Sequence, residues 1–380
     1  MTIKAIAFSA QQRVAERCGI SLQRSHVYES LAAAFGFASY ASLCADAAFY
    51  IGPPGRLVAP RMTDSVARRL AELGFPELLN RQVALELTAV VSDHGLRTVH
   101  IDHVIDSLVP GIYTQTASDE IEHDTGEKYD DAPANDHPLI GDWEASSFLG
   151  SGLEEAAKRG NPKAHYALAL LLRTDEAPVS SPYWHARQMQ GDQLSDVQLE
   201  WASAHRDAAE REATRLRHLC EAARLGHPDA CVDAAAEFED PAFLKAIGQA
   251  TVRDPARASE VAAELGQLDQ AGTWCAIAAQ GGDIEAVRHK IDLFDRDDLL
   301  RRWTWVHFAR LLGTDLTQDD YQLVNEDGSD YDDEVGGPGF PVGVEGVDLP
   351  VLDKQQEARA LGEAQAMVSR LKNGLGVLTP

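Results

Sequence analysis

The feature that most constrains the fold of this chain is a nine-residue pattern that occurs three times. Each copy begins with two alanines, has a glycine three residues after the second alanine, and has another alanine four residues after the glycine. The copies span residues 156–164, 222–230 and 278–286. Their glycines and final alanines are Gly160 and Ala164, Gly226 and Ala230, and Gly282 and Ala286. Such a pattern indicates a chain built from repeated structural units.

Each position of the pattern has a physical meaning in a helix–turn–helix unit. Alanines in the last turn of a helix let a neighbouring helix approach, and glycine adopts the left-handed conformation that ends the helix. Asn161 and Asp283 are expected to cap the following helix, and His227 is a poorer cap. Pro162 and Pro228 fit the first turn of a helix, where no amide hydrogen is needed. Because such a unit cannot bury its apolar face alone, we expect it to stack on its neighbours.

Two further observations bear on the repeat. A large apolar residue follows each glycine after twelve positions, namely Leu172, Phe238 and Phe294. A weaker fourth copy is present at Ala262-Ala263-x-x-Gly266. Alanine-rich helices often end at glycine, so the alternative is an irregular helical domain in which the matches arise from composition.

The pattern resembles the Sel-one-like repeats, a branch of the tetratricopeptide-type helical solenoids. The third copy carries the resemblance best, through Trp274, Ala278, Ala279, Gly282, Asp283, Ala286 and Phe294. The chain departs from the family in its glycine spacings of 66 and 56 residues, where roughly 36–44 is expected. Gly152 and His218 occupy the family's tryptophan position in the first two copies. The resemblance implies a solenoid over about 143–317 that binds proteins and usually carries no catalysis.

The predicted fold class is all-α, a helical-hairpin solenoid preceded by a small helical module. Residues 1–112 form this module, in which Gly and Pro punctuate apolar runs of helical period. Its expected helices span about 9–19, 22–35, 39–49, 64–74, 76–93 and 97–108. Residues 113–142 hold nine acidic residues and one lysine, which predicts a mobile acidic linker between parts that move independently.

The remaining boundaries follow from composition and caps. The solenoid, residues 143–317, contains a polar interruption at 174–196. Residues 318–352 predict a long acidic and glycine-rich loop, and residues 353–380 a C-terminal capping helix with a tail. This helix is expected over 353–372, with Asp353 as its N-cap and Gly374 as its end.

Charge and cysteine content narrow the classes of partner and compartment. The chain has 60 acidic and 34 basic residues and a formal net charge of −26. It therefore repels nucleic acid and anionic lipid unless a local basic patch intervenes, and a protein with a basic surface is the expected partner. Five cysteines, an odd number, predict reduced thiols in a cytoplasmic protein. The apolar runs are too short to span a bilayer, so no membrane is expected as a partner.

The segment from Ser25 to Leu43 resembles a small helical module found on uncharacterised bacterial proteins, some of them labelled glyoxalase-related. The residues that carry this resemblance are Ser25, Glu29, Leu31, Ala32, Gly36, Phe37, Ser39, Tyr40 and Leu43. Gly36 is expected to end one helix and Ser39 to cap the next, while Phe37 and Tyr40 hold the pair together. No glyoxalase-type run of strands is visible, and the resemblance implies no function.

A short stretch, Ala15-x-x-x-Gly19-Ile20-Ser21, also resembles the first helix and turn of a DNA-binding helix-turn-helix. Residues 1–60 carry five basic and three acidic side chains, which locally reverses the sign of the charge. Only Gln23 and Arg24 are clear candidates for reading a DNA groove. A structural helix pair is therefore the favoured interpretation, with a DNA-associated regulator as the alternative function.

Three groups of residues were tested as chemical sites. His218 and Cys220, near His227 and Cys231, are two residues apart on a predicted helix and point to opposite sides, which argues against zinc. The cluster of His94, His100 and His103 lacks the zinc-protease spacing. The acidic run 327–334 lacks the ligand spacing of a calcium loop. We therefore expect no catalytic residue, no cofactor and no metal; an enzyme with an unfamiliar site around the three histidines is a third hypothesis.

Aromatic residues supply the candidate binding side chains. Trp303, Trp305 and Phe308 share one face of a predicted helix, and Trp274 precedes the third repeat glycine. They form either a core face or an anchor for a partner, because exposed aromatic residues dominate many binding surfaces. The sequence thus predicts a non-enzymatic interaction scaffold that holds a protein partner in a concave groove.

Overall fold

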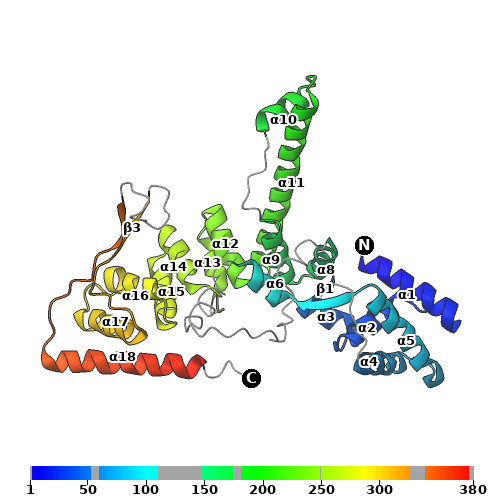
Figure 1. Cartoon of the computed structure of the whole chain (residues 1–380), viewed down its shortest axis with the longest axis horizontal. Helices are drawn as coiled ribbons and strands as arrows, with labels where there is room; N and C mark the ends of the chain where they lie inside the picture. Colours follow the sequence, from blue (N-terminus) through cyan, green and yellow to red (C-terminus); the bar gives the residue numbers. More distant parts are fainter. Residues whose placement is uncertain are drawn as a thin grey trace, which may run out of the picture. The chain divides into compact units, whose positions relative to one another are not determined.

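The computed structural model describes residues 2–52, 60–109, 147–173, 181–248, 250–325 and 339–375 of the 380-residue chain. The chain divides into two compact units, Met1–Cys231 and Val232–Pro380. The described residues are mostly helical, as expected, and add two short antiparallel sheets of two strands each (Figure 1). None of the described helices combines the length and the apolar character that a membrane span requires. The predicted linker 113–142 lies outside the described residues.

The first unit begins with helices that surround a small sheet. Its first elements are α1 (Ile3–Cys18), α2 (Arg24–Ala34), α3 (Tyr40–Asp46), β1 (Ala47–Ile51), α4 (Pro60–Glu72), α5 (Glu77–Asp93), β2 (Leu96–His100) and α6 (Ile101–Leu108). The two strands pair antiparallel, with Ala47 opposite His100 and Ile51 opposite Leu96.

The strands correct the helices expected over 39–49 and 97–108. Residues 47–50 of β1 are all buried, on both faces of the sheet, so the strand shows no two-residue alternation that sequence inspection could detect. One face of β1 lies against α8 (Ser147–Lys158). A run of buried residues without alternation is as compatible with a helix as with a strand, which explains the wrong assignment.

The first repeat hairpin belongs to the same unit as the N-terminal helices. Helix α8 packs against β1, and α9 (Pro162–Leu171) packs against α6 and α11 (Asp196–Arg224). The boundary observed at 231/232 therefore differs from the one expected near 142/143, because the parts on either side of the predicted linker pack together. The predicted interruption 174–196 contains α10 (Pro182–Met189), which lies along α11 (Figure 1).

Gly152 explains one departure from the repeat pattern. A Cβ atom on this residue would lie 3.1 Å from the backbone oxygen of Phe49 and 3.3 Å from its nitrogen. Helix α8 thus approaches the backbone of β1 so closely that a Cβ atom at this position would require the strand to shift by a few tenths of an ångström. A glycine at this position is consistent with the close packing of α8 on a strand.

The second unit is formed by helices and a β-hairpin. Its elements after α12 (Pro228–Phe238), which contains the boundary, are α13 (Ala242–Ile247), α14 (Pro255–Glu264), α15 (Leu268–Gln280), α16 (Ile284–His289), the π-helix η1 (Lys290–Phe294), α17 (Leu299–Leu312), β3 (Asp320–Val324), β4 (Phe340–Val344) and α18 (Lys354–Leu375). Successive helices α14, α15 and α16 pack side by side, and α17 packs against α18.

The structure differs from the sequence-based expectations in the segment 318–352 and at the end of the last helix. Strands β3 and β4 form an antiparallel pair inside the segment 318–352, which was expected to be a loop. Helix α18 has the predicted cap, since the amides of Gln355 and Gln356 donate to Asp353 Oδ1 over 2.9 and 2.8 Å. It continues through the predicted end at Gly374 to Leu375.

The predicted turns are present at all three repeat glycines. Gly160, Gly226 and Gly282 have φ values of +82°, +86° and +95°, and each lies between two successive helices. In every copy the glycine amide donates to the carbonyl of the second alanine, and the next amide donates to the first alanine. The fourth copy, at Gly266, has the same two hydrogen bonds. Ala164, Ala230 and Ala286 are buried, as expected of packing positions.

A second contact links the first two copies. The side chain five residues after the glycine donates to the carbonyl of the second alanine of the pair. His165 does so to Ala157 in the first copy, and Cys231 Sγ lies 3.6 Å from the oxygen of Ala223 in the second. The same two-bond turn also occurs at Gly36, outside the predicted repeats, whereas this additional contact is shared by the first two copies.

A buried ion pair lies in the core of the second unit. Lys290 Nζ lies 3.2 Å from Asp295 Oδ1, and both side chains are at most 12% exposed. Trp305 Nε1 donates to the other carboxylate oxygen over 2.8 Å, and the ammonium group also lies 5.2 Å from the ring centre of Phe294. The carboxylate therefore compensates a charge that has little access to water.

Asp295→Ala should destabilise the second unit by about 3–5 kcal/mol, because it leaves the Lys290 ammonium buried without a partner. The double variant Lys290→Met/Asp295→Ala should be more stable than the single variant, since the uncompensated charge is gone. Urea unfolding followed by tryptophan fluorescence measures both. Asp297→Ala, at an exposed site, is the control. Equal losses in the single and double variants would show that the ion pair is not the cause.

Candidate functional site

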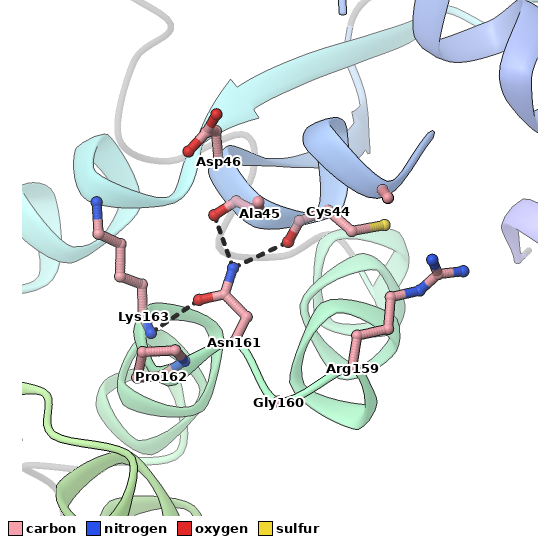
Figure 2. A pocket seen from close by; sticks show the side chains of 9 residues that line it. Cys44, Ala45, Asp46, Arg159, Gly160, Asn161, Pro162 and Lys163 are labelled. Carbon is pink, nitrogen blue, oxygen red and sulfur yellow. Dashed lines mark hydrogen bonds between the residues drawn. The ribbon is translucent and has the colours of Figure 1, made fainter. Parts of the chain in front are cut away.

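A pocket of about 490 Å³ lies where the end of α3 meets the turn between α8 and α9 (Figure 2). It is formed by residues of the N-terminal module and of the first repeat turn. The lining residues are Ala41, Cys44, Ala45, Asp46, Arg159, Gly160, Asn161, Pro162 and Lys163. The repeat glycine Gly160 is thus placed at a contact between two segments that are far apart in the sequence.

Asn161 connects the two sides of this pocket. Its Oδ1 accepts hydrogen bonds from the amides of Lys163 and Ala164, which caps the start of α9. Its Nδ2 donates to the carbonyl oxygens of Cys44 and Ala45 over 2.9 and 2.8 Å, at the end of α3 (Figure 2). One amide therefore satisfies unpaired donors at one helix end and unpaired acceptors at another. The cap was predicted from the sequence, and the contact with α3 was not.

The two basic side chains that line the pocket, Lys163 and Arg159, have partners. Lys163 Nζ lies 2.5 Å from Asp102 Oδ2 on α6. The guanidinium of Arg159 lies 4.8 Å from the ring centre of Tyr40, and it also approaches Glu155 within 3.7 Å. These pairs hold the α8–α9 hairpin against α3 and α6.

The thiol in the pocket is not activated. Burial raises the pKa of Cys44, so the thiol stays neutral near pH 7. A reactive cysteine needs the opposite shift, because the thiolate is the nucleophile. The geometry and electrostatics of the pocket are therefore those of a packing contact between the end of α3 and the turn between α8 and α9.

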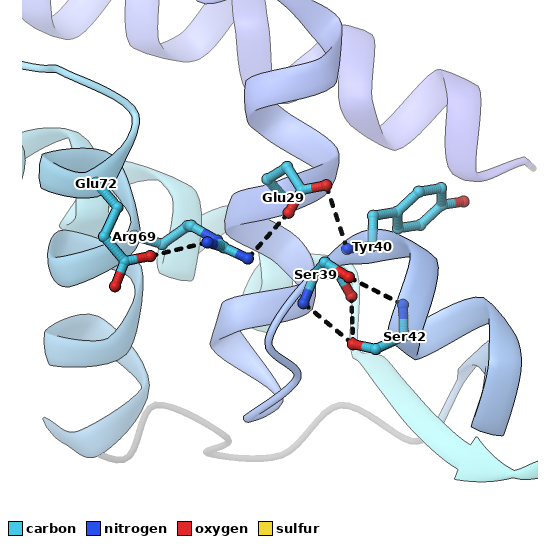
Figure 3. Close-up of polar contacts among 6 residues, drawn as sticks. All are labelled: Glu29, Ser39, Tyr40, Ser42, Arg69 and Glu72. Atoms are coloured by element: carbon cyan, nitrogen blue, oxygen red, sulfur yellow. Dashed lines mark hydrogen bonds and ion pairs between the residues drawn. The ribbon is translucent and has the colours of Figure 1, made fainter.

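The motif of the N-terminal module is organised around Glu29 (Figure 3). Its Oε1 accepts a hydrogen bond from the Tyr40 amide over 3.3 Å, at the first turn of α3. Its Oε2 lies 3.2 Å from Arg69 of α4, which also contacts Glu72. Ser39 and Ser42 form a reciprocal capping box at the start of α3. Glu29 thus links α2, α3 and α4, and the motif has a structural role in this chain.

Helix α2 has little free surface for reading DNA. It packs against α1, α3, α4 and α5. Residues 30–34 are buried in succession, which places neighbours around the whole circumference of its second half. Gln23 and Arg24 are exposed, but they lie at the first turn only. A recognition helix needs an open face along the groove, so this arrangement favours the structural helix pair.

The histidines and cysteines considered as metal ligands in the sequence make other contacts in the structure. His218 of α11 lies beside His165 of α9, with their Nδ1 atoms 2.9 Å apart. His227 is buried and accepts a long hydrogen bond from the Ala230 amide on Nδ1, which makes it a cap after all. Cys231 is buried, and its Sγ contacts the carbonyl of Ala223. Across the described segments, no group of three or more His, Cys, Asp or Glu side chains is arranged to hold a metal. The acidic run 327–334 lies outside the described residues.

The aromatic candidates are placed mainly in the core. Trp305 is 2% exposed and Phe308 is fully buried, together with the alanines of the third repeat. Trp274 is also buried. Trp303 is partly exposed, and its Nε1 donates to the carbonyl of Pro350 over 2.8 Å. Three of the four side chains are thus core residues that a partner cannot reach in this structure.

No protein-family model, curated protein or solved structure matches this chain.

Asn161→Asp should destabilise the first unit by about 1–3 kcal/mol, because the new carboxylate keeps the cap but faces the carbonyls of Cys44 and Ala45 without a donor. Asp283→Asn provides the matched control at the equivalent repeat position, where the side chain only caps, and should change stability by a few tenths of a kcal/mol. Urea unfolding of both variants measures the difference. Equal effects would contradict a role for Asn161 beyond capping.

The first unit should lose stability as the pH falls from about 7.5 to about 5.5. Burial lowers the pKa of His165, and burial together with His165 lowers the pKa of His218. Because the unfolded chain binds more protons than the folded one in this range, protonation favours unfolding. His218→Gln should reduce the pH dependence of the urea midpoint of the first unit, and His289→Gln, which lies in the second unit, is the control. An unchanged slope in His218→Gln would contradict this assignment.

Proposed function

We propose that the protein is a non-enzymatic interaction scaffold that binds a protein partner through the β3–β4 hairpin. The observation that carries this proposal is the exposure of large apolar side chains on this hairpin. Tyr321, Leu323, Phe340, Val342 and Val344 are each 41–51% exposed. Clustered apolar side chains at a surface are typical of interaction sites.

Both faces of the hairpin contribute to this surface. The register places Tyr321 and Leu323 on one face, opposite Gly343 and Pro341. The other face carries Phe340, Val342 and Val344. An isolated two-stranded sheet is only marginally stable in water, and a further strand or layer is needed for independent stability. A bound partner would supply such a layer.

The helical frame holds the base of the hairpin. The amide of Val347 donates to the carbonyl of Leu316 over 2.8 Å, and the amide of Gly346 donates to Asp319 Oδ1 over 2.8 Å. Arg288 of α16 donates to the carbonyl of Glu345 over 3.0 Å. In this proposal the stacked helix pairs of a Sel-one-like solenoid serve as the support, and the hairpin is the binding element. This differs from the concave groove expected from the sequence.

The remaining properties fit a binding protein of a reducing compartment. All five cysteines are free thiols, and burial raises the pKa of each one, so they are neither disulfide-bonded nor activated. The cytoplasm is a compartment in which such thiols stay reduced, so we propose a cytoplasmic location. The pocket at Asn161 is lined by paired basic side chains and a neutral thiol, which supports a structural role.

Site-specific photo-crosslinking tests the proposed function. Benzoylphenylalanine placed at Tyr321 or Phe340 should give discrete adducts with another protein in the cells that make this chain. The same residue at Leu268 or Ile277, which are exposed apolar positions of α15 in the same unit, should not give these adducts. Identical adduct patterns from the hairpin and from α15, or none from the hairpin, would contradict the proposal.

A further inference from the structure

We infer that the outer edge of β3 binds an extended, basic segment of a partner protein as a third strand. This inference rests on the proposed function and specifies the chemistry of the partner. Strand addition to a sheet edge gives affinity through backbone hydrogen bonds and specificity through alternate side chains. The hairpin supplies an edge, an alternating pattern and a negative charge that together define the incoming strand.

Pro341 identifies which edge is open. Proline has no amide hydrogen, and within a sheet it occurs where that position faces away from the neighbouring strand. Pro341 pairs with Leu323, so this pair is one that exchanges no ladder hydrogen bonds, and the same holds two residues along for Tyr321 and Gly343. The backbone groups of Tyr321 and Leu323 therefore face the outer edge of β3. The outer edge of β4 lacks a donor at Pro341, which leaves β3 as the better edge.

The side chains of β3 define the sequence pattern of the incoming strand. Tyr321 and Leu323 lie on one face, and Asp320, Gln322 and Val324 lie on the other. A strand paired with β3 places alternate residues beside these two sets. Apolar residues fit beside Tyr321 and Leu323, and a basic residue fits beside Asp320. The partner segment therefore places apolar residues on one face and at least one basic residue on the other, a pattern that an alternating apolar and basic peptide satisfies.

The charged side chains of the hairpin and of the segments that flank it in the sequence are all acidic. At its base, Arg310 pairs with Asp315, and Arg288 contacts the carbonyl of Glu345. The described residues 315–325 and 339–353 include no lysine, arginine or histidine. They include six acidic residues, namely Asp315, Asp319, Asp320, Glu345, Asp348 and Asp353. Complementary charge raises the rate of association and selects among partners, and salt screens it. A basic segment is therefore favoured over a neutral or acidic one.

A defined peptide tests this inference on the full chain. The probe is a fluorescent octapeptide of alternating lysine and valine, and binding is measured by fluorescence anisotropy. We expect it to bind at least 10-fold more tightly than three relatives: a block peptide of four lysines and four valines, the same alternating peptide N-methylated at every residue, and a glutamate–valine peptide. The block peptide matches the charge, and the methylated peptide matches the side chains but cannot donate backbone hydrogen bonds.

Variants of the protein locate the peptide. Asp320→Lys should weaken binding at least 10-fold, and Leu323→Pro should do the same by removing an outward amide hydrogen. Asp297→Lys changes the same charge at an exposed site away from the hairpin and should keep at least half of the affinity. The proline variant can also weaken binding by disturbing the hairpin. Asp320→Lys does not have this weakness, because lysine is well tolerated on edge strands.

Two outcomes would overturn the inference. Equal binding of the alternating and N-methylated peptides would show that charge alone attracts the probe. Equal weakening by Asp320→Lys and Asp297→Lys would show that the edge of β3 is not the site. Either result leaves the crosslinking test of the hairpin intact, so failure of strand addition is distinguishable from failure of the proposed function.

Discussion

The structure depends on one backbone arrangement, a helix that ends at a left-handed glycine with two amides bonded back to the last turn. At Gly160 the two bonds reach the carbonyls of Ala157 and Ala156, over 2.8 and 3.3 Å. These bonds satisfy carbonyls that the helix end leaves unpaired, and they reverse the chain within two residues. The next helix can then begin at once and lie against the previous one. Small alanines at the contact allow the approach, and this is why the alanines and the glycine recur together.

The residue after the glycine determines what each turn contacts. The Asp283 side chain accepts a hydrogen bond from the Ala286 amide and so caps α16, and within the described residues it makes no second side-chain hydrogen bond. Asn161 caps α9 and also donates to two carbonyls at the end of α3, because an amide has donors that a carboxylate lacks. His227 caps its helix from a buried site and packs against Tyr166, with ring centres 4.6 Å apart. The same turn geometry thus fits three different surroundings, because the residue after the glycine differs in each copy.

Local signals in the sequence were sufficient for the turns and caps, and insufficient for the packing of distant segments. The repeat glycines, Asn161 and Asp353 could be predicted because a cap depends on residues within one helical turn. Strand β1 could not, because its burial on both faces removes the alternation that marks a strand. The pairing of His165 with His218 and the contact of Asn161 with α3 also escaped prediction, since they join residues that are far apart in the sequence. The sequence could not decide whether Trp305 belongs to the core or to a binding surface. Its burial in the structure assigns it to the core.

The acidic charge and the exposed hairpin are consistent with one another on physical grounds. An apolar two-stranded sheet with open edges is a hazard, because two copies of it can pair edge to edge. Here the residues beside the edge, such as Asp320 and Glu345, give both copies the same sign, so that self-pairing brings like charges together. The same charges attract a basic strand. In the proposed interaction, selection of a partner and avoidance of self-association follow from one set of side chains, because the acidic groups that attract a basic strand also repel a second copy of the hairpin.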